Sequence, residues 1–341
     1  MIAAPRGEVK RRAPKRLVAG ARSDHNPHRM RPTPATGTRR LVFASLAVLA
    51  ASIAAPAAGP AQDLEPRAYS ASPVGLNFAV LGYVYSTGDV VTDPSLPITN
   101  AEAHINVMAL GYGRTFALFG RQALITAALP YAWGNAEGDV GDVHRRVTRS
   151  GLADLKARLS VNLLGNPAVS PAEFAQGHQD RVLVAASLTL SAPTGQYDST
   201  KLINLGTHRW AFKPEIGVAV PWKNFDFDLY AGGVFFTRNP SFYPGGSIRE
   251  QDPLAVIQFH ASYTFRPGLW LAADATWYGG GDVHVNDGPG TGRQDNTRVG
   301  GTLSVPISRW HSVKFAYSRG VSVRFGQNFD TYSAAWQFRW F

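Results

Sequence analysis

The sequence predicts an all-β fold, namely a transmembrane antiparallel β-barrel of about 12 strands preceded by a cleavable signal peptide. Three observations lead to this prediction. The chain begins with a targeting segment, continues with a period-two alternation of apolar and polar residues, and ends on the aromatic strand end Arg339-Trp340-Phe341. No stretch approaches the roughly 18 apolar residues of a transmembrane helix. A membrane form must therefore be a closed barrel, because hydrocarbon cannot satisfy open backbone groups.

The N-terminal segment has the layout of a secretory signal. The basic pair Arg39-Arg40 precedes an apolar run over residues 41–55, and small residues and prolines follow to residue 61. A charged region, a short apolar region and a small-residue cleavage zone are the three parts of such a signal. We therefore divide the chain into an N-terminal extension with signal peptide, residues 1–61, and an outer-membrane barrel, residues 62–341.

The formal net charge of +10 belongs to the targeting segment. Residues 1–61 contain 11 of the 34 Lys and Arg and 2 of the 24 Asp and Glu, so the remaining 280 residues carry 23 positive and 22 negative charges. The basic composition therefore does not indicate nucleic-acid binding, and we expect none. Residues 1–29 are polar and unlike a signal peptide, so either Met1 or Met30 is the true start.

Period-two alternation divides the rest of the chain into strands. In the clearest case, residues 152–163, Leu155 and Leu159 fall on one face while Lys156 and Arg158 fall on the other. Large aromatic residues gather near strand ends, as in the interfacial girdles of a membrane barrel, and an even strand number suits a bacterial single-chain barrel. The predicted strands are residues 75–85, 103–114, 122–132, 152–163, 182–192, 210–220, 225–236, 254–265, 269–278, 296–307, 312–320 and 330–341.

The connections between these strands alternate in length. Short periplasmic turns and long outer loops are typical of outer-membrane barrels. One connection, residues 164–181, is long although its place in the order makes it periplasmic. Either it carries extra structure or the strand count is wrong there. Short turns are predicted at 221–224, 266–268 and 308–311, and long loops at 86–102, 133–151, 193–209, 238–253 and 279–295.

The alternation also assigns charged side chains to the lumen. Both signs are present, so these residues do not form a single-sign ring that selects one class of ion. One interpretation is a salt-bridge network that fills and stiffens a narrow barrel. The other is a polar channel wall. The lumen-lining candidates are Asp154, Lys156, Arg158, Lys213, Glu215, Asp226, Asp228, His260, Asp274, Arg298 and Lys314.

His260 and Ser262 raise the question of a membrane hydrolase, since a spacing of two places both on one face of a strand. Phe259 and Ala261 form the apolar face of that strand, so His260 and Ser262 point inward, away from lipid. No third orienting group is identifiable either. We therefore predict that the protein is not an enzyme. The chain has no cysteine, and its histidines lack metal-type spacing. We expect no cofactor and no metal ligand.

Several segments carry a family resemblance, and the block at 192–215, which begins Ala192-Pro193-Thr194-Gly195, is the most specific. The segments are residues 63–69, 72–75, 192–198, 201–206, 209–215, 297–300, 317–320 and 337–340. On these segments the chain resembles the meta-pathway of phenol degradation family of exported outer-membrane barrels. The resemblance covers essentially the whole mature chain. It implies a transporter-like barrel that passes small aromatic or other hydrophobic compounds.

These observations lead to three functional hypotheses. The first is an outer-membrane channel for passive passage of small hydrophobic or aromatic compounds. The second is a closed structural or receptor-type barrel, and the third, disfavoured above, is an outer-membrane hydrolase. The expected location is the outer membrane of a Gram-negative bacterium, with membrane lipid as a partner and Phe341 as the contact for the assembly machinery. The apolar candidates for the outer mouth, where a hydrophobic solute would enter, are Leu202, Ile203, Leu205, Phe242 and Tyr243.

Overall fold

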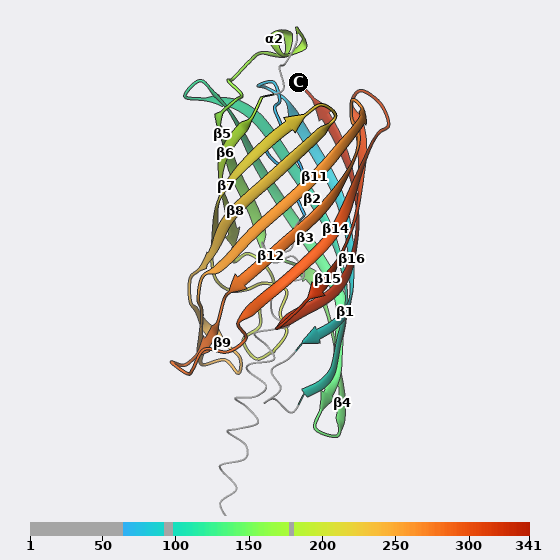
Figure 1. Cartoon of the computed structure of the whole chain (residues 1–341). Coiled ribbons are helices and arrows are strands. Elements are labelled where there is room, and N and C mark those ends of the chain that lie inside the picture. Colours follow the sequence, from blue (N-terminus) through green and yellow to red (C-terminus); the bar gives the residue numbers. More distant parts are fainter. Residues whose placement is uncertain (1–63, 92–97, 177–180) are drawn as a thin grey trace, which may run out of the picture.

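The computed structural model describes residues 64–91, 98–176 and 181–341. Within these residues, 12 strands form one closed antiparallel barrel (Figure 1). Each strand pairs with its neighbour in the chain, and the last strand pairs with the first, with Asn77 opposite Trp340. The predicted fold class and strand number are therefore confirmed. The predicted signal peptide, residues 1–61, lies outside the described residues.

The barrel strands follow the predicted ranges, with longer outer ends on the first three. They are β1 (Asn77–Val91), β2 (Ile98–Leu118), β3 (Arg121–Val140), β5 (Leu155–Leu164), β6 (Leu183–Ala192), β7 (Ala211–Trp222), β8 (Phe225–Phe236), β11 (Leu254–Arg266), β12 (Leu269–Gly280), β14 (Gln294–Pro306), β15 (His311–Ser322) and β16 (Gly326–Trp340).

The prediction of a loop at 133–151 was wrong. Strand β3 continues to Val140 and pairs with β4 (Val143–Leu152) across a two-residue turn. The glycines of this stretch suggested a loop, but they serve close strand packing. A Cβ on Gly134 would lie 2.2 Å from the backbone oxygen of His104 on β2. The predicted loop at 86–102 is likewise mostly strand, since β1 runs to Val91 and β2 starts at Ile98.

The long connection at 164–181 carries extra structure, and the strand count holds. It contains the short helix α2 (Pro171–Ala175), which starts with a capping box between Ser170 and Glu173. Figure 1 places α2 at the same end of the barrel as the C-terminus. Short turns at Gly120, Gly268 and near Trp310 lie at this end too, so it is the periplasmic end by the usual rule for such barrels.

The loops at the other end contain a small second sheet. Its strands are β9 (Asn239–Phe242), β10 (Ser247–Gln251) and β13 (Val283–Val285), in the order β13-β10-β9. The predicted loops at 238–253 and 279–295 therefore contain paired strands rather than irregular chain alone. The sheet gives the outer loops a fixed framework at the mouth of the barrel.

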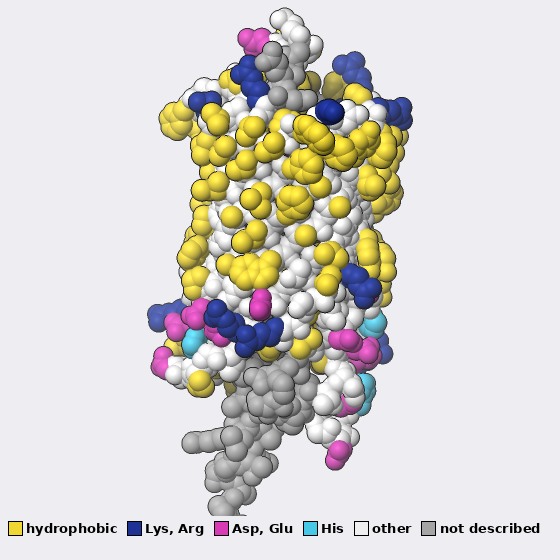
Figure 2. Space-filling view, viewed as in Figure 1, with side chains coloured by type: hydrophobic (Ala, Val, Ile, Leu, Met, Phe, Trp, Pro, Cys, Tyr) yellow, Lys and Arg dark blue, Asp and Glu magenta, His cyan; other side chains and the backbone are white. Residues whose placement is uncertain are grey.

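The outside of the barrel carries a broad apolar belt (Figure 2). Outward side chains such as Leu110, Ile216 and Phe259 remain well exposed in the isolated chain, as lipid-facing residues do. At the periplasmic end, the rings of Trp336, Phe338 and Trp340 stack along β16. Charged residues gather beyond the belt near the outer loops (Figure 2). None of the described helices is long and apolar enough to span a membrane.

Candidate functional site

The inner wall of the barrel differs from one side to the other. On β1, β2 and β3 the inward side chains are mostly small and apolar, and many are only half-buried, which leaves them accessible from the lumen. We call this wall the apolar sector. It comprises Val80, Gly82 and Val84 of β1, Ile105, Val107, Ala109 and Gly111 of β2, and Leu124, Ala128, Pro130 and Ala132 of β3.

The wall from β5 to β15 carries the charged and hydrogen-bonding side chains, and we call it the polar sector. All the lumen candidates named from the sequence lie at inward positions here, so the predicted charges gather on one side of the lumen. They are Asp154 just before β5, Lys156 and Arg158 on β5, Lys213 and Glu215 on β7, Asp226 and Asp228 on β8, His260 on β11, Asp274 on β12, Arg298 on β14 and Lys314 on β15.

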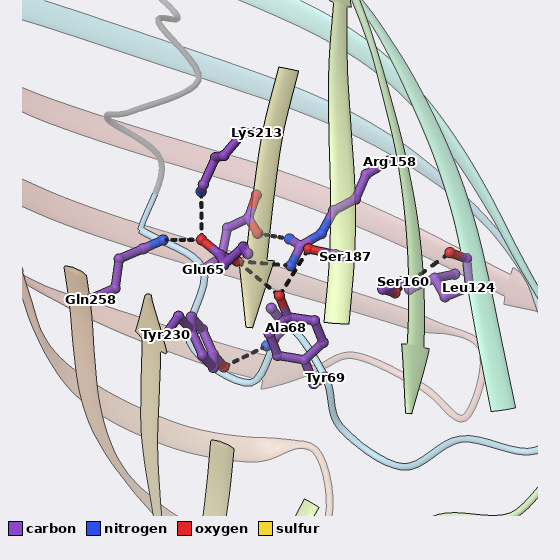
Figure 3. A network of polar contacts seen from close by, with 11 residues as sticks. Glu65, Ala68, Tyr69, Leu124, Arg158, Ser160, Ser187, Lys213, Tyr230 and Gln258 are labelled. Atoms are coloured by element: carbon purple, nitrogen blue, oxygen red, sulfur yellow. Dashed lines mark hydrogen bonds and ion pairs between the residues drawn. The ribbon is translucent and has the colours of Figure 1, made fainter. Parts of the chain in front are cut away.

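Residues 64–73, which precede β1, fold into the lumen against the polar sector, and we call them the N-terminal plug (Figure 3). Tyr69 is its most deeply buried residue, with 3% of its surface exposed. Its hydroxyl donates to Oε1 of Glu215 at 2.9 Å and lies 2.9 Å from Oγ of Ser187. The ring of Tyr230 packs edge-on against it, with 5.0 Å between the centroids. The plug is therefore held at a specific position on the barrel wall.

Arg67 is the second anchor of the plug. Its backbone amide donates to Oδ2 of Asp228 at 3.1 Å, and its Nε donates to Oγ of Ser262 at 2.8 Å. The guanidinium forms an ion pair with Asp226 and lies 5.0 Å from the ring centroid of Trp270. These contacts reach strands β8, β11 and β12. One plug residue thus bridges three neighbouring strands.

Glu215 is the centre of the polar network, and its partners Lys213, Arg158 and Gln258 are labelled in Figure 3. It accepts from Nζ of Lys213 at 2.7 Å, from Nη2 of Arg158 at 3.2 Å and from Nε2 of Gln258 at 3.2 Å. Arg158 also forms an ion pair with Glu65 of the plug. The Tyr69 hydroxyl of the plug thus donates to the carboxylate at the centre, and the Glu65 carboxylate of the plug accepts from the neighbouring guanidinium. A buried charge network of this kind is stable only when every member is paired, so the plug and the wall depend on each other.

His260 belongs to a separate buried pair. Its Nδ1 lies 2.6 Å from Oδ1 of Asp274, and Thr302 donates to the other carboxylate oxygen at 2.8 Å. Ser262 is instead a partner of Arg67 in the plug. A hydrolytic serine needs its general base within hydrogen-bond reach. This arrangement therefore does not make Ser262 and His260 a nucleophile and its base.

Two cavities flank the plug. One, of about 440 Å³, lies beside the plug and is lined by Phe78 and Leu124 and by polar side chains such as Arg158 and Lys314. The other, of about 570 Å³, is lined by plug residues together with Lys223 and Pro267 of two periplasmic turns. The plug thus narrows the lumen without filling it.

The outer mouth is covered by the loop between β6 and β7. Leu202 packs against both Phe242 and the apolar cluster around Val90, and Arg149 Nε donates to the backbone oxygen of Ile203 at 2.9 Å. Phe242 is only 3% exposed. Leu202, Ile203 and Phe242 therefore belong to a packed loop core. The five mouth candidates named from the sequence are Leu202, Ile203, Leu205 and Tyr243, which are half-buried, and Phe242, which is buried.

The sequence interpretation missed the plug residues Glu65, Arg67 and Tyr69 as part of the lumen. Residues 63–69 entered it only as a segment that carries a family resemblance. A signal was present, because two opposite charges and a tyrosine follow one another in a stretch without strand alternation. Their partners are more than 90 residues away in the chain, for example 93 for Arg158 and Glu65. No local pattern could name those partners.

One group on the described part of the chain has the spacing of a cation site. Ligand atoms of Glu102, His104 and Glu137 lie within 4.8 Å of one another near the outer ends of β2 and β3. Nδ1 of His104 lies 2.7 Å from Oγ1 of Thr87, which leaves Nε2 to face the carboxylates. Arg146 already provides Glu137 with a positive partner, since its Nε lies 3.6 Å away. Glu137 therefore already has a cationic partner within the protein.

The comparison with family models matches residues 85–338 to the family described as Putative MetA-pathway of phenol degradation. The match spans more than half of the chain. The chain belongs to this family. The resemblance noted in the sequence is thereby confirmed. Among curated proteins, no sequence matches the chain.

Two solved structures share the fold. An outer membrane channel from Pseudomonas putida F1 has a TM-score of 0.68 at 21% identity, over 82% of this chain and all (100%) of that one. The transport unit of the autotransporter AIDA-I from Escherichia coli has a TM-score of 0.51 at 10% identity, over 87% of this chain and 98% of that one. The chain thus has the fold of outer-membrane barrels. Together with the apolar belt, this fold places the protein in an outer membrane.

Proposed function

We propose that the protein is an outer-membrane channel through which small hydrophobic or aromatic compounds pass passively, without catalysis. The observation that carries the proposal is the apolar sector, most of whose inward residues are half-buried rather than buried. A barrel that is only structural has no need for such a surface. The cavity beside the plug, about 440 Å³, includes Leu124 of this sector in its lining and falls in the usual range for a small-molecule site.

Family membership and shape support the same proposal. The family description refers to phenol degradation, and the Pseudomonas putida protein of the same fold is described as an outer membrane channel. A small aromatic ring is apolar on both faces and has a compact cross-section. Such a ring is suited to a path between the apolar sector and the plug.

The test is uptake into porin-deficient cells, whose outer leaflet slows hydrophobic solutes. Accumulation of a labelled small aromatic, such as phenol or toluene, should rise on expression of the protein. Deletion of residues 202–205, which pack across the outer mouth, should change the rate of accumulation while the barrel remains folded. An equal deletion in the loop that contains Gly288 and Gly290 is the matched control.

A closed structural or receptor-type barrel is the second candidate, because the plug is hydrogen-bonded to the wall at several points. Uptake distinguishes the two. If expression of a correctly folded protein accelerates the entry of no small aromatic or other small solute, the channel proposal fails and the closed barrel stands.

A further inference from the structure

Inside the barrel, the acidic side chains have partners, but some of the basic side chains lack an acidic partner among the described residues. The described interior carboxylates have partners: Glu65 and Glu215 pair with Arg158, Asp226 with Arg67, and Asp274 with His260. Asp154 accepts from the backbone amides of Gly195 and Thr207, and Asp228 accepts from that of Arg67. Three interior cations, in contrast, have no carboxylate at ion-pair distance within the described part of the chain. They are Arg209, Arg298 and Lys314.

Arg298 projects from β14 and is 3% exposed. Its Nη2 donates to the backbone oxygen of Phe329 at 2.8 Å and to Oγ of Ser318 at 3.2 Å. Nε and Nη1 of the same guanidinium are buried and have no hydrogen-bond partner among the described residues. A buried guanidinium with unused donors and no counter-charge is costly. An anionic group at this position would use those donors and supply the missing counter-charge.

Arg209 lies at the outer mouth and is 6% exposed. One of its nitrogens, Nη2, donates to Oε1 of Gln251 at 2.5 Å, while Nη1 is buried without a described partner. The guanidinium carbon lies 4.2 Å from the ring centroid of Phe236. Burial, and next the charge of Arg249, hold the pKa of Arg209 well below its usual value. An anion bound here would relieve both effects and would also meet an aromatic face.

Lys314 lies deeper, on β15, where it lines the cavity of about 440 Å³ beside the plug. Its ammonium lies 5.4 Å from the ring centroid of Trp270. Phe78 and Leu124 line the same cavity. A ligand in this cavity therefore meets the ammonium of Lys314, the ring of Phe78 and, from the apolar sector, Leu124.

We propose that the preferred solutes of this channel are small aromatic anions, with a carboxylate or sulfonate group attached directly to the ring. The anionic group contacts Arg209, Arg298 and Lys314 in turn, while the ring moves along the apolar sector. Guanidinium groups bind carboxylates and sulfonates through paired hydrogen bonds, and a spare positive charge in a narrow lumen repels cations. This inference rests on the channel function proposed above and narrows its substrate class.

The test uses the full mature protein in planar bilayers, with two ions of equal ring size and opposite charge. Benzenesulfonate and phenyltrimethylammonium are both permanently charged, so neither crosses lipid as a neutral species. Reversal potentials in salt gradients should show benzenesulfonate to be about tenfold more permeant. Methanesulfonate, which lacks the ring, should be less permeant than benzenesulfonate.

Matched variants assign the effect to residues. Arg298→Gln and Lys314→Gln should each reduce the preference several-fold, whereas Arg298→Lys, which keeps the charge, should retain most of it. Arg309→Gln, in an exposed periplasmic turn outside both cavities, is the control and should leave the preference unchanged. Heat-modifiable gel migration verifies that each variant is folded.

The outcomes separate this inference from the channel function. Equal permeation of the two aromatic ions, a cation preference, or methanesulfonate passing faster than benzenesulfonate would overturn the inference. The same holds if neither ion passes while neutral aromatics still enter cells. If neither ion passes and expression accelerates no aromatic uptake, the channel function fails as well.

Discussion

The apolar and polar sectors line the same lumen but make different contacts with the plug. Inward residues of β7 and β11, such as Glu215 and Ser262, are buried under the plug and hydrogen-bonded to it. Inward residues of β1 and β2 such as Val84 and Ala109 are half-exposed and apolar. On this side only the last plug residues are hydrogen-bonded: the Thr115 hydroxyl of β2 donates to the backbone oxygen of Pro73 at 2.6 Å, and Gln122 of β3 accepts from the amide of Ser72 at 2.7 Å. The charged anchors of the plug thus all contact the polar sector. The polar sector therefore determines where the plug lies. The apolar sector borders the part of the lumen that the plug does not fill.

The largest expected effect comes from releasing the plug. Replacing its three anchors together, E65A/R67A/Y69A, removes two ion pairs and the tyrosine hydrogen bonds, each worth about 1 kcal/mol or more. The barrel should still close, because the ladder between β1 and β16 does not involve these residues. Single-channel conductance should rise several-fold.

Ser70→Ala is the control for that experiment, since the Ser70 hydroxyl bonds only to the backbone oxygen of Arg67 within the same turn. Its conductance should match that of the unchanged protein. If the triple variant conducts no better than Ser70→Ala, the plug does not limit passage.

The next effect tests whether the apolar sector is the path. Ala109→Asp on β2 places a charge on that sector and should slow entry of neutral aromatics by about tenfold, because the solute must pass a hydrated carboxylate. Thr189→Asp on β6 places the same charge on the polar sector and should slow entry far less. Uptake by porin-deficient cells measures both. Equal slowing by the two variants would contradict a sector-specific path.

A smaller effect is expected from weakening the centre of the polar network. Glu215→Gln keeps the shape but leaves Lys213 without its 2.7 Å ion pair and weakens the contact with Arg158. The free energy of unfolding should fall by about 1–3 kcal/mol. A urea titration in detergent, followed by heat-modifiable migration, measures it. Lys223→Gln, remote from the network, should leave the midpoint unchanged.

The smallest effect concerns the end of the chain rather than either sector. Phe341 follows β16 directly and is exposed. Its deletion should lower the yield of protein assembled in the outer membrane, while export to the periplasm stays intact. Fractionation with quantitative blotting provides the measurement. An unchanged yield would show that the assembly machinery does not read this residue.

The sequence could predict the strands because each is a local pattern. Leu155 to Leu163 alternates so regularly that both the strand and its lipid-facing side follow from neighbouring residues alone. The extension of β3 to Val140 escaped prediction, because the need for Gly134 arises from the approach of β2, which is some 30 residues away. When only its neighbours in the sequence are considered, a glycine indicates a loop.

For the candidate site, the sequence could predict the positions of the residues on the barrel wall but not their pairing. The inward direction of Glu215 or Arg298 follows from strand phase, so their places on the wall could be stated. Which of these residues are paired could not be predicted from the sequence. The pairing depends on Glu65 and Arg67, which lie in a segment without strand alternation. The spare positive charge of Arg298 likewise appears only after every interior carboxylate has found its partner in three dimensions.

The position of the plug also implies an order for the steps of folding: the barrel strands first, and the plug afterwards. Arg67 stands ahead of the first strand, yet its partner Ser262 follows 195 residues later, on β11. The segment that precedes the first strand can therefore take its final place only after most of the barrel has formed. Protection of Tyr69 from a chemical label would thus mark the completion of assembly, whereas protection of β1 would mark its beginning. Residues 64–91 thus contain both the segment that we expect to be placed last and the strand that we expect to form early.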